Sequence, residues 1–132
     1  MSEIAAPRVL VIDDNAINID LVAYVLDADG FVVEAAADAE QALARLATFR
    51  PDVILMDIQM PGIDGLTLTR RLKSDPATRQ IPIVAFTAYA MKGDEAKIRA
   101  AGCDGYVSKP IDVTRFAGAV RAYIAGARGV SS

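Results

Sequence analysis

Short apolar segments alternate along this chain with segments of helical periodicity, and this alternation restricts the fold more than any other property of the sequence. Continuous apolar runs bounded by turn residues indicate buried strands, and the segments between them are typical of amphipathic helices. Alternating strands and helices form βαβ units, which place the strands parallel in one sheet. The sequence therefore predicts five strand–helix pairs, with strands over about 8–12, 31–35, 53–56, 83–86 and 105–107.

The helices between these strands carry start and stop signals. Asp38, with Gln41 three residues later, is typical of a capping box, and Asp112 is placed to cap the last helix. Glycines follow the first and fourth helices, where a left-handed residue commonly ends a helix. In the first helix, apolar residues recur at intervals of three and four, which predicts one buried stripe. That stripe consists of Ile17, Leu21, Tyr24, Val25 and Ala28.

The composition fits one small domain. At 132 residues, 53% of them hydrophobic, the chain can build one sizeable core and is too apolar to be disordered. We expect the domain to span 8–125, between tails at 1–7 and 126–132. No apolar run approaches the roughly 20 residues that span a bilayer. The first seven residues do not resemble a secretory signal, so we expect a cytoplasmic protein without membrane insertion.

Charge, cysteine and histidine content exclude several kinds of function. The formal net charge of −3 argues against a general nucleic-acid binder, which usually has a basic face. The single cysteine, Cys103, cannot form an internal disulfide or a multi-cysteine zinc site, and we expect a packed thiol near a turn. The sequence contains no histidine, which excludes histidine metal ligands, a Ser-His-Asp triad and a phosphohistidine on this chain. It also lacks the Gly-rich Walker loop of nucleotide-using kinases.

Polar side chains stand just past the ends of four predicted strands. Asp13 and Asp14 follow the first strand, Asp57 the third, Thr87 the fourth and Lys109 the fifth. In an open parallel sheet, ligands bind at the carboxyl ends of the strands. We therefore expect these five residues to converge on one small polar pocket.

This set of side chains suits a divalent cation and a phosphoryl group. Three close carboxylates repel one another unless a cation lies between them, and Mg²⁺ prefers such oxygen ligands. A rigidly held carboxylate such as Asp57 can act as a nucleophile toward phosphorus. Positioning and charge neutralisation dominate phosphoryl transfer. The metal and Lys109 would supply the cations, and Thr87 would donate a hydrogen bond to a phosphoryl oxygen.

The same residues allow plainer interpretations. An acidic pair such as Asp13 and Asp14 is commonly a solvated turn or a cap, Asp57 could cap a helix, and Lys109 could be a surface charge. The joint placement of all five residues favours the site. The Lys109–Pro110 peptide bond could be cis, turning the ammonium inward, or an ordinary trans turn, and the sequence leaves both open.

These residues resemble the receiver domain of two-component response regulators. The resemblance rests on Asp13-Asp14, on Asp57 within the segment 55–65 (Leu-Met-Asp-Ile-Gln-Met-Pro-Gly-Ile-Asp-Gly), on Thr87-Ala88 and on Lys109-Pro110. It covers about residues 8–125, and the hallmark positions match in order and spacing. It implies a flavodoxin-like, doubly wound (βα)5 fold of the CheY type, with a five-stranded parallel sheet in strand order 2-1-3-4-5.

The resemblance assigns the metal ligands and the phosphoacceptor. It implies that Asp57 accepts the phosphoryl group, and that Asp14 and Asp57 bind Mg²⁺ directly together with the backbone carbonyl of Gln59. Asp13 would act mainly through a water molecule.

The resemblance also implies a switch. Thr87 and Lys109 would hold phosphoryl oxygens, and Tyr106 would turn inward as Thr87 moves toward the phosphate. The alternative for Tyr106 is a simple edge-strand core residue. Three neighbours are expected to tune the lifetime of the phosphoaspartate. Small Ala88 leaves room for the phosphoryl group, while Gln59 and bulky Tyr89 flank the line along which water attacks.

The resulting hypothesis is a stand-alone response regulator of a phosphorelay rather than an enzyme. The phosphoryl group would come from a phosphohistidine of a sensor histidine kinase or a histidine phosphotransfer protein. Since the sequence starts at Met1 and ends shortly after the domain, we expect output through contacts with a downstream protein. Parts of the sequence are most similar to a single-domain branch of the family, which suggests cell-cycle or cell-fate control.

Two rival functions fit less well. A phosphohydrolase with an aspartyl nucleophile generally needs a second acid two positions later, where this chain has Gln59. A receiver-like binding module that is never phosphorylated usually lacks an acid of the pair, the acceptor or the lysine. This chain keeps all of them.

Overall fold

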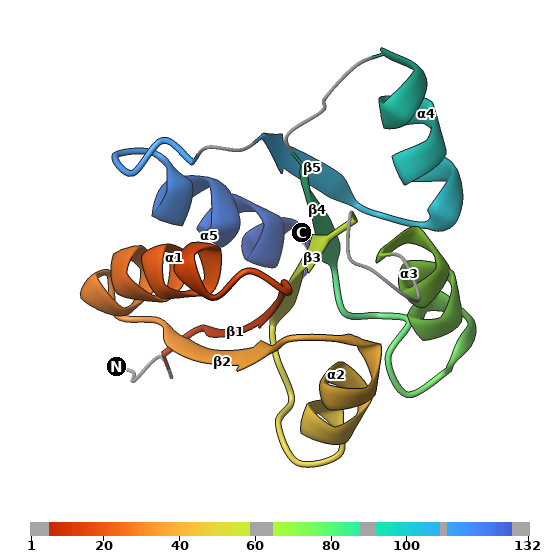
Figure 1. Ribbon diagram of the computed structural model, residues 1–132, viewed down its shortest axis with the longest axis horizontal. Helices are drawn as coiled ribbons and strands as arrows, with labels where there is room; N and C mark the ends of the chain where they lie inside the picture. The colour runs from red at the N-terminus through yellow and green to blue at the C-terminus, as the bar shows by residue number, and fades with distance from the viewer. Residues whose placement is uncertain (1–5, 59–64, 88–91, 109–110, 128–132) are drawn as a thin grey trace.

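The computed structural model describes residues 6–58, 65–87, 92–108 and 111–127, and these form a five-stranded parallel sheet flanked by five helices (Figure 1). The strand order β2-β1-β3-β4-β5 confirms the expected doubly wound, flavodoxin-like fold. The strands are β1 (Arg8–Ile12), β2 (Val32–Ala36), β3 (Val53–Asp57), β4 (Ile83–Thr87) and β5 (Gly105–Ser108). The helices are α1 (Ala16–Ala28), α2 (Ala39–Leu46), α3 (Gly65–Ser74), α4 (Lys92–Ala101) and α5 (Phe116–Ala127).

Helices cover both faces of the sheet. In Figure 1, α1 and α5 lie on one side of the strands, and α2, α3 and α4 lie on the other. Successive strand residues point to opposite faces, so each strand feeds two hydrophobic clusters. Leu10, Ile54 and Ile83 pack into the cluster under α2, α3 and α4, and their neighbours pack into the cluster under α1 and α5. This double burial explains why the strands are continuously apolar.

Strand β3 lies in the middle of the sheet. All five of its residues are buried, and it pairs with β1 on one side and β4 on the other. Its last residue, Asp57, therefore emerges from the most enclosed part of the fold.

The predicted capping box and the two glycine stop signals are confirmed. The Asp38 carboxylate accepts a hydrogen bond from the Gln41 amide at 2.8 Å, while the Gln41 side chain accepts one from the Ala37 amide at 2.9 Å. Gly30 and Gly102 have φ values of +89° and +108°, in the left-handed region that glycine adopts without strain. No helix in the described ranges combines the length and apolar composition needed to cross a membrane.

The last helix begins later than the predicted cap at Asp112 implies. Residues 113–115 form a turn, and α5 starts at Phe116. The Asp112 carboxylate accepts hydrogen bonds from both the amide and the hydroxyl of Thr114, at 3.0 and 2.7 Å, which lowers the pKa of Asp112. Asp112 thus caps the turn that leads into α5 rather than the helix itself.

The predicted buried stripe of α1 is wrong for most of its residues. Ile17 and Tyr24 are 77% and 75% exposed, Leu21 is 41% exposed, and the buried residues of α1 are Val22 and Leu26. Of the predicted stripe, Val25 alone packs against the core, where it is half-buried. The helix is apolar around most of its circumference, so two different stripes satisfy the helical period. The Asn15 side chain caps the helix by accepting bonds from the amides of Ile17 and Asn18, at 2.9 and 3.2 Å. Docking onto the sheet then selects which stripe is buried.

Substitutions on the two sides of α1 should show by their effect on stability which stripe is buried. Leu26→Ala should lower the free energy of unfolding by about 2–5 kcal/mol, because it leaves a cavity under the sheet. Tyr24→Ala should change that energy by no more than about 0.5 kcal/mol, since the ring is exposed. Denaturant unfolding of both variants measures the difference, and equal losses would contradict this assignment of the faces.

Candidate functional site

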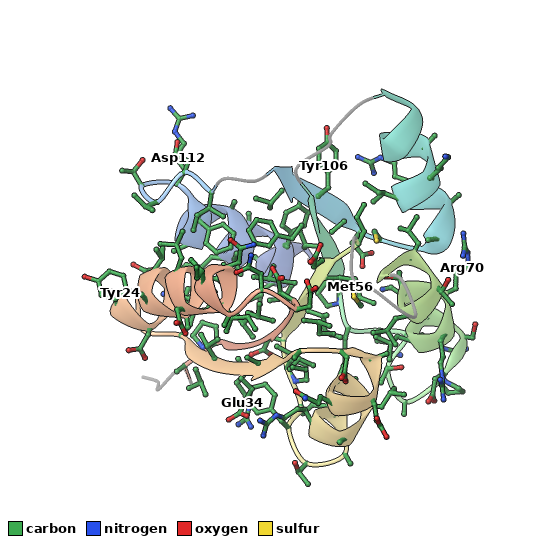
Figure 2. All side chains as sticks on the ribbon, in the orientation of Figure 1. Tyr24, Glu34, Met56, Arg70, Tyr106 and Asp112 are labelled. Carbon is green, nitrogen blue, oxygen red and sulfur yellow. The ribbon has the colours of Figure 1, made fainter. Side chains whose placement is uncertain are left out.

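Three carboxylates meet at the carboxyl edge of the sheet. Ile12 of β1 pairs with Met56 of β3, so Asp13 and Asp57 stand at the same level of adjacent strands. Both are buried, at 0% and 3% exposure, whereas Asp14 is exposed. One oxygen of each carboxylate lies within 4.8 Å of the others. Figure 2 labels Met56, the residue before Asp57, near the centre of the molecule.

Local hydrogen bonds fix the first carboxylate. The Asp13 amide donates to the Ala36 carbonyl at 3.0 Å, which ties the end of β1 to the end of β2. One Asp13 carboxylate oxygen accepts a hydrogen bond from the Asn15 amide at 2.9 Å. Because Asn15 is the N-cap of α1, the same short turn ends the strand, places two acids and starts the helix.

The donor set suits a hard divalent cation. Carboxylate oxygens are preferred by Mg²⁺ and Ca²⁺, and Mg²⁺ is commonly held by one or two carboxylates plus water. A cation bound between three carboxylates at this distance would offset their repulsion. In the part of the chain that the structure describes, Asp13, Asp14 and Asp57 are the one cluster of three or more potential metal ligands of this kind. The cluster can therefore hold a metal ion.

The other predicted site residues are placed only in part. Thr87 is the last residue of β4, and its backbone pairs with Ser108 at the same edge of the sheet, next to the strand that ends at Asp57. Its side chain, and all of Lys109, lie outside the described residues, as do Gln59, Ala88 and Tyr89. The geometry thus bears on the acidic cluster, and the roles of these five residues stay predictions.

Tyr106, labelled in Figure 2, lies on β5. Its backbone pairs with Ala85 of β4. It is half-buried and packs against the hydrophobic cluster under α2, α3 and α4. An intermediate burial suits a side chain with a large apolar ring and a polar tip. Its role as a switch stays a prediction.

The sequence reasoning missed one residue at this site, Gly65. A Cβ atom built on Gly65 would lie 2.4 Å from the Asp57 carbonyl oxygen and 2.5 Å from the Ile58 Cα. The first residue of α3 thus packs directly on the backbone of Asp57, and only glycine fits there. The sequence predicts this helix only from 66, directly after Gly65, and a glycine at that junction, where another backbone can approach closely, was the signal available.

Cys103 is a buried thiol, as expected. It follows the turn after α4 and is 6% exposed. Burial raises the pKa of the Cys103 thiol above its ordinary value. Its sulfur lies 3.8 Å from the hydroxyl of Thr69, which is itself fully buried. A thiol in this environment stays protonated and packs as a small apolar group.

Comparison with known proteins agrees with this geometry. The family described as the response regulator receiver domain matches residues 9–121. The polar-differentiation response regulator DivK of Brucella anthropi is 43% identical over 119 residues, which cover 90% of this chain and 97% of that protein. The similarity thus spans nearly the whole of both chains.

Solved structures share the fold. The chemotaxis protein CheY4 of Vibrio cholerae has a TM-score of 0.85 and 27% identity, covering 90% of this chain and 99% of that one. The receiver domain of the sensor histidine kinase PA1611 from Pseudomonas aeruginosa PAO1, solved with a magnesium ion coordinated in its active-site cleft, has a TM-score of 0.82 and 32% identity. That match covers 91% of this chain and 98% of the other. With Asp13, Asp14 and Asp57 gathered at the family's characteristic sheet edge, the chain belongs to the response regulator receiver domains.

Proposed function

We propose that this protein is a phosphoacceptor switch of a two-component phosphorelay, and that Asp57 receives the phosphoryl group. The observation that carries the proposal is the gathering of three carboxylates, within 4.8 Å of one another, at the end of the buried strand β3. The 43% identity to the response regulator DivK, over 90% of this chain, also supports the proposal.

The reaction transfers the group from a histidine of a partner to this chain. A carboxylate oxygen of Asp57 attacks phosphorus, the new P–O bond forms, and the P–N bond of the partner's phosphohistidine breaks. The imidazole nitrogen leaves with the electron pair of that bond. Because Asp57 sits at the end of a strand buried on both faces, its attacking oxygen is held in position rather than ordered during the reaction. Water later hydrolyses the acyl phosphate, which returns the switch to its starting state.

Mg²⁺ fits the acidic cluster and belongs to the proposal. Asp14, Asp57 and the backbone carbonyl of Gln59 would bind it, with Asp13 acting through water. When bound, the cation offsets the negative charge of the phosphoryl oxygens and of the carboxylates. Thr87 and Lys109 would hold the remaining phosphoryl oxygens. The magnesium coordinated in the PA1611 receiver domain supports this assignment.

Output would pass through a change at the α4-β5-α5 face. Thr87 moves toward the phosphoryl group, and Tyr106 on β5 turns into the space that it leaves, so phosphorylation biases a two-state element. Ala88, Tyr89 and Gln59 would set how fast water reaches the acyl phosphate. The name of DivK, a polar-differentiation regulator, supports a role in cell-cycle or cell-fate control.

The exposed stripe of α1 is suited to receive the phosphoryl donor. Ile17, Leu21 and Tyr24 lie at intervals of four and three on one face of the helix, and Tyr24 projects away from the sheet in Figure 2. The stripe begins two residues after Asn15, next to the acidic cluster. A helical donor, such as a sensor histidine kinase or a histidine phosphotransfer protein, could cover this apolar stripe and present its phosphohistidine to Asp57.

Phosphorylation tests the central proposal. With acetyl phosphate and Mg²⁺, the wild type should take up one phosphoryl group per chain, and Asp57→Asn should take up none, as measured by intact-protein mass spectrometry. Lys109→Ala should slow uptake because it removes one of the two cations. A wild type that is never labelled would favour an unphosphorylated binding module, and catalytic release of phosphate from many esters would favour a hydrolase.

Repulsion within the acidic cluster gives a second prediction. Two unit charges about 4 Å apart repel by about 4 kcal/mol at an effective dielectric constant of 20. In EDTA, Asp57→Asn should therefore raise the free energy of unfolding by roughly 1 kcal/mol or more. Saturating Mg²⁺ should stabilise the wild type more than the variant. Denaturant unfolding with and without Mg²⁺ measures both effects, and identical Mg²⁺ responses would contradict a cation site at Asp57.

Docking on α1 gives a third prediction. Ile17→Ser and Tyr24→Ser should each slow phosphoryl transfer from the cognate kinase by about tenfold or more, as expected for anchor residues of an interface. Uptake from acetyl phosphate should stay unchanged, since neither residue belongs to the acidic cluster. Val32→Ser is the matched control, because Val32 is also an exposed apolar residue but lies at the opposite end of the sheet. Loss of transfer in the control as well would count against this surface.

A further inference from the structure

One face of α3 joins the phosphoacceptor to the turn between α4 and β5. Gly65, Thr69 and Lys73 follow one another at intervals of four and therefore lie in a row along the helix, which we call the α3 row. The row starts at the backbone of Asp57 and ends at residues 102–104, which we call the α4–β5 turn. Each of its three members contacts one of these two segments.

The contact at Gly65, where the row starts, is steric. Gly65 packs on the Asp57 carbonyl so closely that no Cβ atom fits between them. A closely packed interior has low compressibility. Any movement of the Asp57 backbone toward α3 must therefore displace the helix.

The contact at Thr69, in the middle of the row, consists of buried hydrogen bonds. The Thr69 hydroxyl donates to the Gly65 carbonyl at 2.7 Å and accepts from the Cys103 thiol at 3.8 Å. Thr69 is fully buried. Valine would fill the same volume without a polar atom, so packing alone does not require this hydroxyl. Its bonds connect the first turn of α3 to the α4–β5 turn.

The contact at Lys73, where the row ends, is an ion pair. The Lys73 ammonium donates to the Asp104 carboxylate at 2.9 Å, and to the carbonyls of Ile81 and Arg79 at 2.9 and 3.2 Å. All three of its protons are thus used. The Asp104 carboxylate also accepts a bond from the Ile83 amide at 2.8 Å, which ties the turn to the start of β4.

We propose that the α3 row is a strut that couples the Asp57 backbone to the α4–β5 turn, with Thr69 and Lys73 as its positioning residues. A change at Asp57 shifts α3 through Gly65, and the shift reaches the turn through the two polar contacts. Coupling of this kind is reciprocal, so a partner that binds the turn changes the state of Asp57. The response to phosphorylation rests on the proposed function, whereas the mechanical coupling does not.

Hydrogen exchange at the turn tests the strut. The amides of Cys103 and Asp104 donate to the carbonyls of Ile98 and Ile83, at 3.2 and 2.7 Å, so their exchange rates report opening of the turn. Two perturbations change Asp57, at the other end of the α3 row. One is the substitution Asp57→Asn, which needs no phosphorylation, and the other is treatment with acetyl phosphate and Mg²⁺. Each should change the two exchange rates by about fivefold or more, the lower end of typical coupling between sites.

Variants of the row should remove this response. In the backgrounds Thr69→Val and Lys73→Met, the same perturbations should change the exchange rates by less than about twofold, because the contacts that carry the shift are gone. Thr69→Ser keeps the hydroxyl and should restore the response. Arg71→Met, on an exposed residue of the same helix, should leave the response intact.

The outcomes are separable. The strut is wrong if the exchange rates of Cys103 and Asp104 respond to the perturbations as strongly in Thr69→Val and Lys73→Met as in the wild type. It is also wrong if Asp57→Asn, as a single substitution in the full chain, leaves these two rates unchanged. Absence of phosphoryl uptake combined with a clear, row-dependent response to Asp57→Asn would overturn the proposed function and leave the strut standing.

Discussion

The burial of β3 is the constraint on which the rest of this structure depends. Its four apolar residues are divided between the two hydrophobic clusters, and it pairs with a neighbour on each side. A strand enclosed in this way slides or tilts only if the helices packed on it move with it. The core therefore places the carboxylate of its last residue at the sheet edge, and the pairing of β1 with β3 places Asp13 beside it. The fold brings together charges that repel, and hydrophobic burial holds them there.

The two apolar stripes of α1 illustrate a different principle. Burial of Val22 and Leu26 attaches the helix to the sheet, while Ile17, Leu21 and Tyr24 stay exposed. An apolar stripe left in water is unfavourable for a monomer. Its position beside the acidic cluster is the reason that we propose it as the surface that a phosphoryl donor covers. One face of the helix thus packs on the core, and the other is exposed.

Helix α3 contacts two segments of the chain that are far apart in sequence, the end of β3 and the α4–β5 turn. Gly65 lacks a side chain because the Asp57 carbonyl occupies its place, and Lys73 reaches a carboxylate 31 residues away. Both properties reduce intrinsic helix stability or cost side-chain entropy. The close contacts with Asp57 and with the α4–β5 turn are thus made at the expense of the stability of the isolated helix.

The sequence by itself determined the strands, their parallel arrangement and the acidic cluster of the site. Continuous apolar runs have few alternatives to buried strands, and Asp13, Asp14 and Asp57 stand where such strands end. Local signals such as the Asp38–Gln41 capping box were equally readable, because they act within a few residues. Only the tertiary structure decided which stripe of α1 is buried, since both stripes satisfy the same period and docking on the sheet chooses between them. It also decided that Gly65 abuts Asp57 and that Thr69 and Lys73 meet the α4–β5 turn, because contacts between distant segments depend on packing and leave no local pattern in the sequence.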